Sequence, residues 1–222
     1  MKKSRSLNET HPANEPGAVG VRTAAIHAGT PANAVTGAAA PDIVMSTTFV
    51  IDPSIAFSAD EMTEETPFVY TRWGNPTVAQ LERKLAVLEG AEACVAFGSG
   101  VAAIAALFLH VLKAGDHMVM SDVTYAAASE FANQKLPNLG IEVTRIDTSD
   151  PENVRAALRP NTRLVYLETP VNPLLRLTDI EAVCKIAGPA GVAVAVDSTF
   201  ATPIGTRPVE LGADYVIHMD PW

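Results

Sequence analysis

Residues 192–197 read VAVAVD, an uninterrupted apolar run that ends in an acidic residue, Asp197. The segments HMVMS at 117–121 and LVYLE at 164–168 are also predicted as strands. Nearly continuous apolar runs of this length are typical of strands that are buried on both faces, as in parallel sheets. Segments with helical periodicity alternate with these runs. The sequence therefore predicts an α/β fold with a mostly parallel sheet that is covered on both faces.

The other elements follow outward from these strands. Further strands are predicted at 92–97, 141–146 and 215–217. A helix should open at Asn75-Pro76 and close at Gly90, because Asn caps helices, Pro suits the first helical position and Gly suits the residue after the end. Helices are also predicted at 101–112, 151–158 and 179–187, and from after Tyr125 to near Pro137.

Residues 1–65 lack a sustained period, so we expect them to form a tail and an extended arm without a core of their own. Residues 66–222 should form one domain. The chain of 222 residues is 48% hydrophobic and 18% charged, a balance typical of packed globular proteins. Its net charge of −9 argues against a nucleic-acid or anionic-membrane surface, because both need clustered positive charge.

Neither targeting nor metal chemistry is indicated. Residues 1–20 lack the apolar stretch of a signal peptide, and the apolar stretch at 100–109 is too short to span a membrane. We therefore expect a cytoplasmic protein. Cys94 and Cys184 form no CxxC pair, so neither a disulfide framework nor a metal site is predicted.

Polar residues follow several predicted strands, at the sheet edge where α/β proteins bind ligands. The turn Gly98-Ser99-Gly100 opens a helix and could bind a phosphate through its N–H groups, or could be only a turn. Asp197 could bind a ligand or cap the next turn. A dinucleotide site is a further alternative, because Gly98, Gly100 and Ala103 fit the G-x-G-x-x-A pattern and Asp122 ends the next strand.

Six motifs taken together resemble the Cys/Met-metabolism family of pyridoxal-phosphate (PLP) enzymes, which includes cystathionine γ-synthase, cystathionine γ-lyase and O-acylhomoserine sulfhydrylase. They run in the family's order between Thr23 and His218. The motifs are YTR-W-GNPT at 70–77, LEGAEA at 88–93, GSG at 98–100, ETPVNP at 168–173, VDSTFATP at 196–203 and LGADYVIH at 211–218. The dinucleotide alternative, an NAD(P)-binding oxidoreductase, leaves most of these motifs without a role.

This resemblance implies the aspartate-aminotransferase-like fold, PLP fold type I. An N-terminal arm precedes a large PLP domain with a seven-stranded type of sheet, a smaller C-terminal domain follows, and the family assembles as a dimer of dimers. The implied activity is carbon–sulfur chemistry on sulfur amino acids or O-acylhomoserine, by γ-replacement or by γ- or β-elimination. PLP is the implied cofactor and an amino acid the implied substrate.

The resemblance also implies two groups of phosphate-binding residues. Tyr70 and Arg72 should reach the phosphate of a neighbouring subunit's PLP, since Arg binds phosphate in a bidentate manner and Tyr adds a hydroxyl donor. Ser99, Gly100 and Val101 should bind the phosphate of the chain's own PLP.

Four further residues are implied to contact the ring. Tyr125 should stack on it, Asn172 should bond its 3-oxygen, and Asp197 should face its nitrogen with Thr199 in support. A carboxylate at that nitrogen favours the protonated ring, which strengthens the ring's pull on electrons. We expect Tyr125 and Asp197 to be the catalytic residues.

The sequence departs from the family in two places. Ala126-Ala127 follow Tyr125 where methionine γ-lyases often have Cys, which disfavours that branch. After His218 the family continues with a lysine flanked by Ser or Thr, whereas this chain reads MDPW at 219–222. We therefore expect an incomplete PLP domain, without the family's C-terminal domain and inactive alone. None of the lysines lies at the aligned position: Lys2, Lys3, Lys84, Lys113, Lys135 and Lys185. The alternative is a non-catalytic PLP-binding fragment or partner subunit that completes a neighbour's site.

Overall fold

The computed structural model describes residues 19–30, 32–33, 35–51 and 66–219. The chain divides between Ala96 and Phe97 into two compact units. The domain boundary expected after residue 65 borders a range outside the described residues, 52–65, and stays a prediction.

The first unit contains helices α1 (Val21–His27) and α2 (Pro76–Glu89). The caps predicted for α2 are confirmed: the Asn75 side chain accepts the Thr77 N–H at 2.9 Å, and Gly90 has φ 72°. Residues 21–27 form a helix where an extended arm was expected. A seven-residue helix is marginal in isolation, and this one is stabilised by packing on α2, with Ala24 and Ala28 buried.

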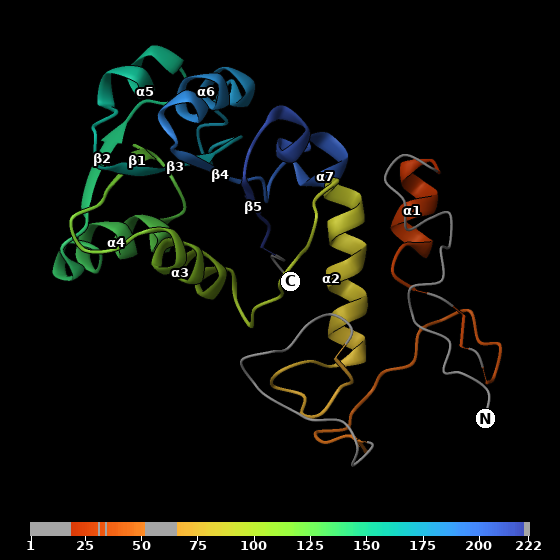
Figure 1. Ribbon diagram of the computed structural model, residues 1–222. Coiled ribbons are helices and arrows are strands. Elements are labelled where there is room, and N and C mark those ends of the chain that lie inside the picture. Colours follow the sequence, from red (N-terminus) through yellow and green to blue (C-terminus); the bar gives the residue numbers. More distant parts are fainter. Residues whose placement is uncertain (1–18, 31, 34, 52–65, 220–222) are drawn as a thin grey trace. The chain divides into compact units, whose positions relative to one another are not determined.

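The second unit contains a parallel five-stranded sheet in the order β2-β1-β3-β4-β5 (Figure 1). The strands are β1 (His117–Ser121), β2 (Glu142–Ile146), β3 (Thr162–Glu168), β4 (Ala193–Asp197) and β5 (Tyr215–Ile217). The helices are α3 (Gly100–Val111), α4 (Ala126–Gln134), α5 (Pro151–Ala157), α6 (Ile180–Ala187) and α7 (Thr202–Gly205), with 3-10 turns η3 (Pro137–Leu139), η4 (Gly188–Ala190) and η5 (Pro208–Leu211). The parallel α/β fold is confirmed, and the five strands and helices α3 to α6 agree with the predicted ones to within a few residues, whereas α7 and the 3-10 turns were not predicted.

Helices cover both faces of this sheet. Figure 1 shows α3 and α4 on one face and α5 and α6 on the other. Alternate strand residues supply the two cores: Met118, Leu164 and Tyr166 pack with α3 and α4, whereas Val165 and Val194 pack with α5 and α6. Burial on both faces explains why these strands are apolar throughout.

The strand predicted at 92–97 is wrong. This stretch has a strand-like composition but joins no ladder among the described residues. A strand needs a hydrogen-bonded neighbour, and the Ala96 N–H instead donates to the Glu82 side chain at 2.8 Å. Val95 and Phe97 are consequently exposed.

No helix in the described ranges is both long enough and apolar enough to cross a membrane.

Candidate functional site

Asp197 is the last residue of β4 and is 2% exposed. Its Oδ1 accepts hydrogen bonds from the Thr199 hydroxyl at 2.6 Å and the Thr199 N–H at 3.1 Å. Its Oδ2 accepts a third from the Tyr166 hydroxyl at 3.3 Å. Within the described ranges, no basic side chain pairs with this carboxylate. A buried carboxylate without a counter-charge is costly, so the site suits a ligand that brings a cationic group.

Glu168 ends the neighbouring strand β3 and is the register partner of Asp197. It is buried, and its two oxygens accept from different segments: Oε2 from the Tyr125 N–H at 2.5 Å, and Oε1 from the Asn172 N–H at 3.3 Å. Burial raises the pKa of the Glu168 carboxyl, the two N–H donors oppose that rise, and nearby Asp197 adds to it. Glu168 thus connects two of the predicted site residues.

The turn Gly98-Ser99-Gly100 opens α3, as expected. Ser99 is the N-cap, and its hydroxyl accepts the Ala102 N–H at 3.2 Å. The N–H groups of Gly100 and Val101 lie in the first turn of α3 and have no intrahelical acceptor, so they are available to an anion.

Met219 lies against this turn. A Cβ on Gly100 would overlap the Met219 side chain, which therefore covers the open face of Gly100. The Met219 N–H donates to the Thr199 hydroxyl at 2.9 Å, and that hydroxyl donates to Asp197. A group that binds this face of Gly100 has to displace the thioether.

The structure brings most of the predicted residues to one edge of the sheet. Tyr125 follows β1, Asn172 follows β3 and Asp197 ends β4, all at the carboxyl ends of parallel strands. The contacts through Met219 and Glu168 link the α3 turn, Thr199, Asp197, Tyr125 and Asn172 within the second unit. The turn, the carboxylate and the exposed Tyr125 ring are together suited to a phosphorylated aromatic cation such as protonated PLP.

Tyr70 and Arg72 lie in the first unit. The Arg72 guanidinium is 5.3 Å from the centroid of the Tyr70 ring, and its Nη2 donates to the Tyr70 hydroxyl at 3.4 Å. The two side chains therefore form a local pair, and their role toward a neighbouring subunit stays a prediction.

Three contributors were not among the predicted site residues: Glu168, Tyr166 and Met219. The sequence could have indicated Glu168, because it ends an apolar run that is predicted as a strand, as Asp197 does. Tyr166 gave no such signal, since it lies inside the run. Burial and then Asp197 raise the pKa of Tyr166 well above its usual value, so its hydroxyl stays protonated and donates to Asp197.

The geometry disfavours the dinucleotide alternative. Asp122 forms an ion pair with Arg176 and accepts the Val123 N–H at 2.9 Å, so its side chain is already engaged. The glycine turn also follows no strand, although the dinucleotide pattern requires one.

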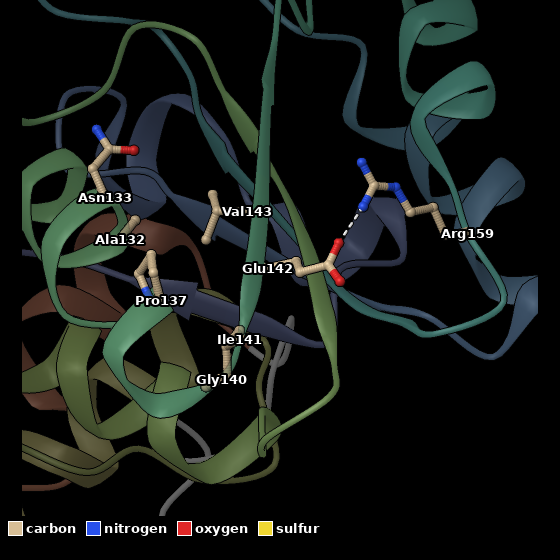
Figure 2. Close-up of a pocket in the computed structure, with 8 residues that line it drawn as sticks. All are labelled: Ala132, Asn133, Pro137, Gly140, Ile141, Glu142, Val143 and Arg159. Atoms are coloured by element: carbon tan, nitrogen blue, oxygen red, sulfur yellow. Dashed lines mark hydrogen bonds and ion pairs between the residues drawn. The ribbon is translucent and has the colours of Figure 1, made fainter.

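A separate pocket of about 520 Å³ lies beside α4, η3 and β2 (Figure 2). Glu142, the first residue of β2, forms an ion pair with Arg159 at 2.5 Å, which is drawn as a dashed line in Figure 2. This pocket is therefore at the amino end of its strand, away from the residues above. Among the residues that the structure describes, no group of three or more His, Cys, Asp or Glu side chains could hold a metal ion.

Comparison with known proteins identifies the family of this chain. The model of a family described as Cys/Met metabolism PLP-dependent enzyme matches residues 22–220. L-methionine γ-lyase of Porphyromonas gingivalis is 48% identical over 90% of the chain and 50% of its own length. Cystathionine γ-lyase of Bacillus subtilis is 40% identical over 89% of the chain and 50% of its own length.

A solved structure is similar over the same part of the chain. The crystal structure of metB from Corynebacterium glutamicum has a TM-score of 0.83 and 39% identity, covering 94% of this chain and 51% of that one. The chain therefore spans about half the length of the relatives it matches.

Proposed function

The chain belongs to the Cys/Met-metabolism family of PLP-dependent enzymes, and from this premise we propose that it supplies coenzyme-binding residues of an enzyme that makes or breaks carbon–sulfur bonds. The substrates of that enzyme are sulfur amino acids or O-acylhomoserine, and the reaction is γ-replacement or γ- or β-elimination. The 48% identity to L-methionine γ-lyase keeps methionine among the candidates, despite the expectation from Ala126-Ala127.

The observation that carries the proposal is the buried Asp197 carboxylate without a basic partner in the described part of the chain. PLP, when bound, withdraws electrons from the substrate carbon, and it does so best with a protonated ring nitrogen. Asp197 holds that proton in place by its charge. Thr199 and Tyr166 orient the carboxylate through their hydroxyl groups.

The other residues of the site bind and orient the coenzyme. Tyr125 covers one face of the ring, and Asn172 bonds the 3-oxygen. The N–H groups after Ser99 bind the phosphate once Met219 has moved, at the positive end of the α3 dipole. Tyr70 and Arg72 add donors to a neighbouring subunit's phosphate, which makes the enzyme a homo-oligomer, by the family pattern a dimer of dimers. Free cysteines at positions 94 and 184 suit the proposed cytoplasmic location.

Two experiments test the proposal. The first titrates this chain with PLP and follows binding by equilibrium dialysis and by the circular dichroism that the bound ring acquires. The second joins residues 1–218 to the lysine motif and C-terminal domain of a family member. This chimera is assayed with L-cystathionine, with L-methionine, and with O-succinylhomoserine plus cysteine.

The proposal requires saturable PLP binding by the chain and PLP-dependent turnover of at least one of these substrates by the chimera. Absence of PLP binding would refute the coenzyme site. PLP binding with no turnover by the chimera would favour a non-catalytic partner subunit. NADH binding that requires Asp122 would favour the dinucleotide alternative.

A further inference from the structure

We propose that Glu168 is a positioning residue of this site, which holds the Tyr125 ring and the Asn172 amide in one arrangement through their backbone N–H groups. This inference rests on the proposed function and deepens it, because Tyr125 and Asn172 are the residues assigned to the coenzyme ring. Glu168 itself is not assigned a contact with the coenzyme.

Glu168 is the most firmly placed of the three residues. It ends the central strand β3, which pairs with β1 on one side and with β4 on the other. Its side chain is buried, whereas Tyr125 is 40% exposed and Asn172 is also exposed. Packing therefore restrains Tyr125 and Asn172 less than it restrains Glu168. The hydrogen bonds that their N–H groups donate to Glu168 hold both residues in a fixed position relative to the sheet.

Tyr125 depends on this bond because of its place in the chain. It is the N-cap residue of α4, and its side chain makes no capping hydrogen bond. Its N–H donates to Glu168 Oε2 at 2.5 Å, and a carboxylate acceptor makes this a charge-assisted bond. The bond fixes the point at which α4 begins and so the direction in which the Tyr125 ring leaves the backbone.

Asn172 lies in the loop between β3 and α6. The end of this loop nearer α6 is held by ion pairs of its own. Arg176 forms ion pairs with Asp122 and Asp147. The Asn172 end is held by its N–H bond to Glu168 Oε1 at 3.3 Å. Loss of the Glu168 bond should therefore release Asn172 without releasing the whole loop.

Only a side chain with two acceptor oxygens can serve both N–H groups at once. The carboxylate of Glu168 accepts with each oxygen, whereas the amide of a glutamine has one acceptor and one NH₂ donor. Glu168→Gln keeps the size of the side chain and must leave one of the two N–H groups facing another donor. The matched control is Glu181→Gln, because Glu181 is an exposed α6 residue that forms an ion pair with Lys185 at 2.6 Å, away from the site.

The test compares the wild-type chain, Glu168→Gln and Glu181→Gln in three measurements. These are the dissociation constant for PLP, the visible circular dichroism per bound PLP at saturation, and amide hydrogen exchange at Tyr125 and Asn172. Urea unfolding of each protein monitors global stability.

For Glu168→Gln we expect PLP affinity to fall about tenfold or more, as for the loss of one charge-assisted hydrogen bond. We also expect altered circular dichroism per bound PLP and faster exchange at Tyr125, Asn172 or both. Glu181→Gln should match the wild type throughout. A purely structural role would not change the circular dichroism of the PLP that remains bound.

Unchanged affinity and circular dichroism in Glu168→Gln would overturn the positioning role while leaving the proposed function intact. Faster exchange throughout the chain, in proportion to lost stability, would also overturn it. A wild-type chain that binds no PLP would refute the proposed function and this inference together. If Glu168→Gln does not fold, Glu168→Asp is measured in its place, because its shorter carboxylate cannot reach both N–H groups.

Discussion

Two substitutions of Asp197 distinguish the effect of its charge from the effect of its hydrogen bonds. Asp197→Asn keeps an oxygen for the two Thr199 donors and places an NH₂ group near Tyr166. It also removes a buried charge that has no basic partner in the described ranges. We expect its unfolding free energy, without ligand, to stay within about 1 kcal/mol of the wild type.

Asp197→Ala should behave differently. It leaves the Tyr166 hydroxyl, which is 0% exposed, without an acceptor, at a cost of about 1–3 kcal/mol. The loss of both Thr199 bonds adds about 1 kcal/mol, as for a lost cap. The total of about 2–4 kcal/mol lowers stability whether or not PLP is present.

In both variants, PLP should raise the unfolding free energy by less than it does in the wild type. At 100 times the wild-type dissociation constant, PLP should stabilise the wild-type chain by about 2.7 kcal/mol. A charge-assisted bond to the ring nitrogen corresponds to roughly 30-fold in affinity. The same PLP concentration should then stabilise Asp197→Asn by only about 0.9 kcal/mol.

Urea unfolding with and without PLP measures these differences. The matched control is Asp150→Asn, since Asp150 is the exposed N-cap of α5 and Asn caps a helix equally well. If PLP stabilised Asp197→Asn against urea as much as it stabilises the wild type, the assignment of Asp197 to the ring nitrogen would be refuted. Wild-type stability in Asp197→Ala would refute the hydrogen-bond argument.

Three further predictions concern Met219, His117 and the activity of the chain alone. Met219→Ala should lower the PLP dissociation constant about fivefold, because a side chain partly buried against Gly100 no longer has to be displaced, and equal or weaker affinity in equilibrium dialysis would contradict this. Burial and then Arg159 lower the pKa of His117 in the folded chain, so unfolding free energy should be constant above about pH 6.5 and fall by up to about 1.4 kcal/mol per unit as the pH drops toward the lowered value. Urea unfolding from pH 7.5 to 5.5 should show this slope in the wild type and a smaller one in His117→Gln. The chain alone should not turn over L-cystathionine, since no lysine is expected at the aligned position, and PLP-dependent product above a blank would disprove this.

Local patterns in the sequence determined most of the fold. Apolar runs such as 192–197 predicted strands that are buried on both faces, and the β4 strand pairs with β3 and β5 inside a parallel sheet. Asn75 and Gly90 predicted the ends of α2, because caps depend on the backbone conformation of single residues. The family motifs grouped Asp197, Asn172 and Tyr125, since Asp197 ends β4 and the other two lie in the segments that follow β3 and β1.

Contacts between distant segments were decided only by the tertiary structure. Residues 92–97 have the composition of a strand, but a strand exists only if a neighbour pairs with it, and composition does not specify the neighbour. Glu168 binds N–H groups 43 residues before it and 4 residues after it, and only the alignment of parallel strand ends places both within reach. The Met219 side chain covers Gly100 because β5, which Met219 follows, lies in contact with α3. Burial and hydrogen bonding along one segment are encoded locally, whereas the contacts that join segments depend on how the strands are ordered in the sheet.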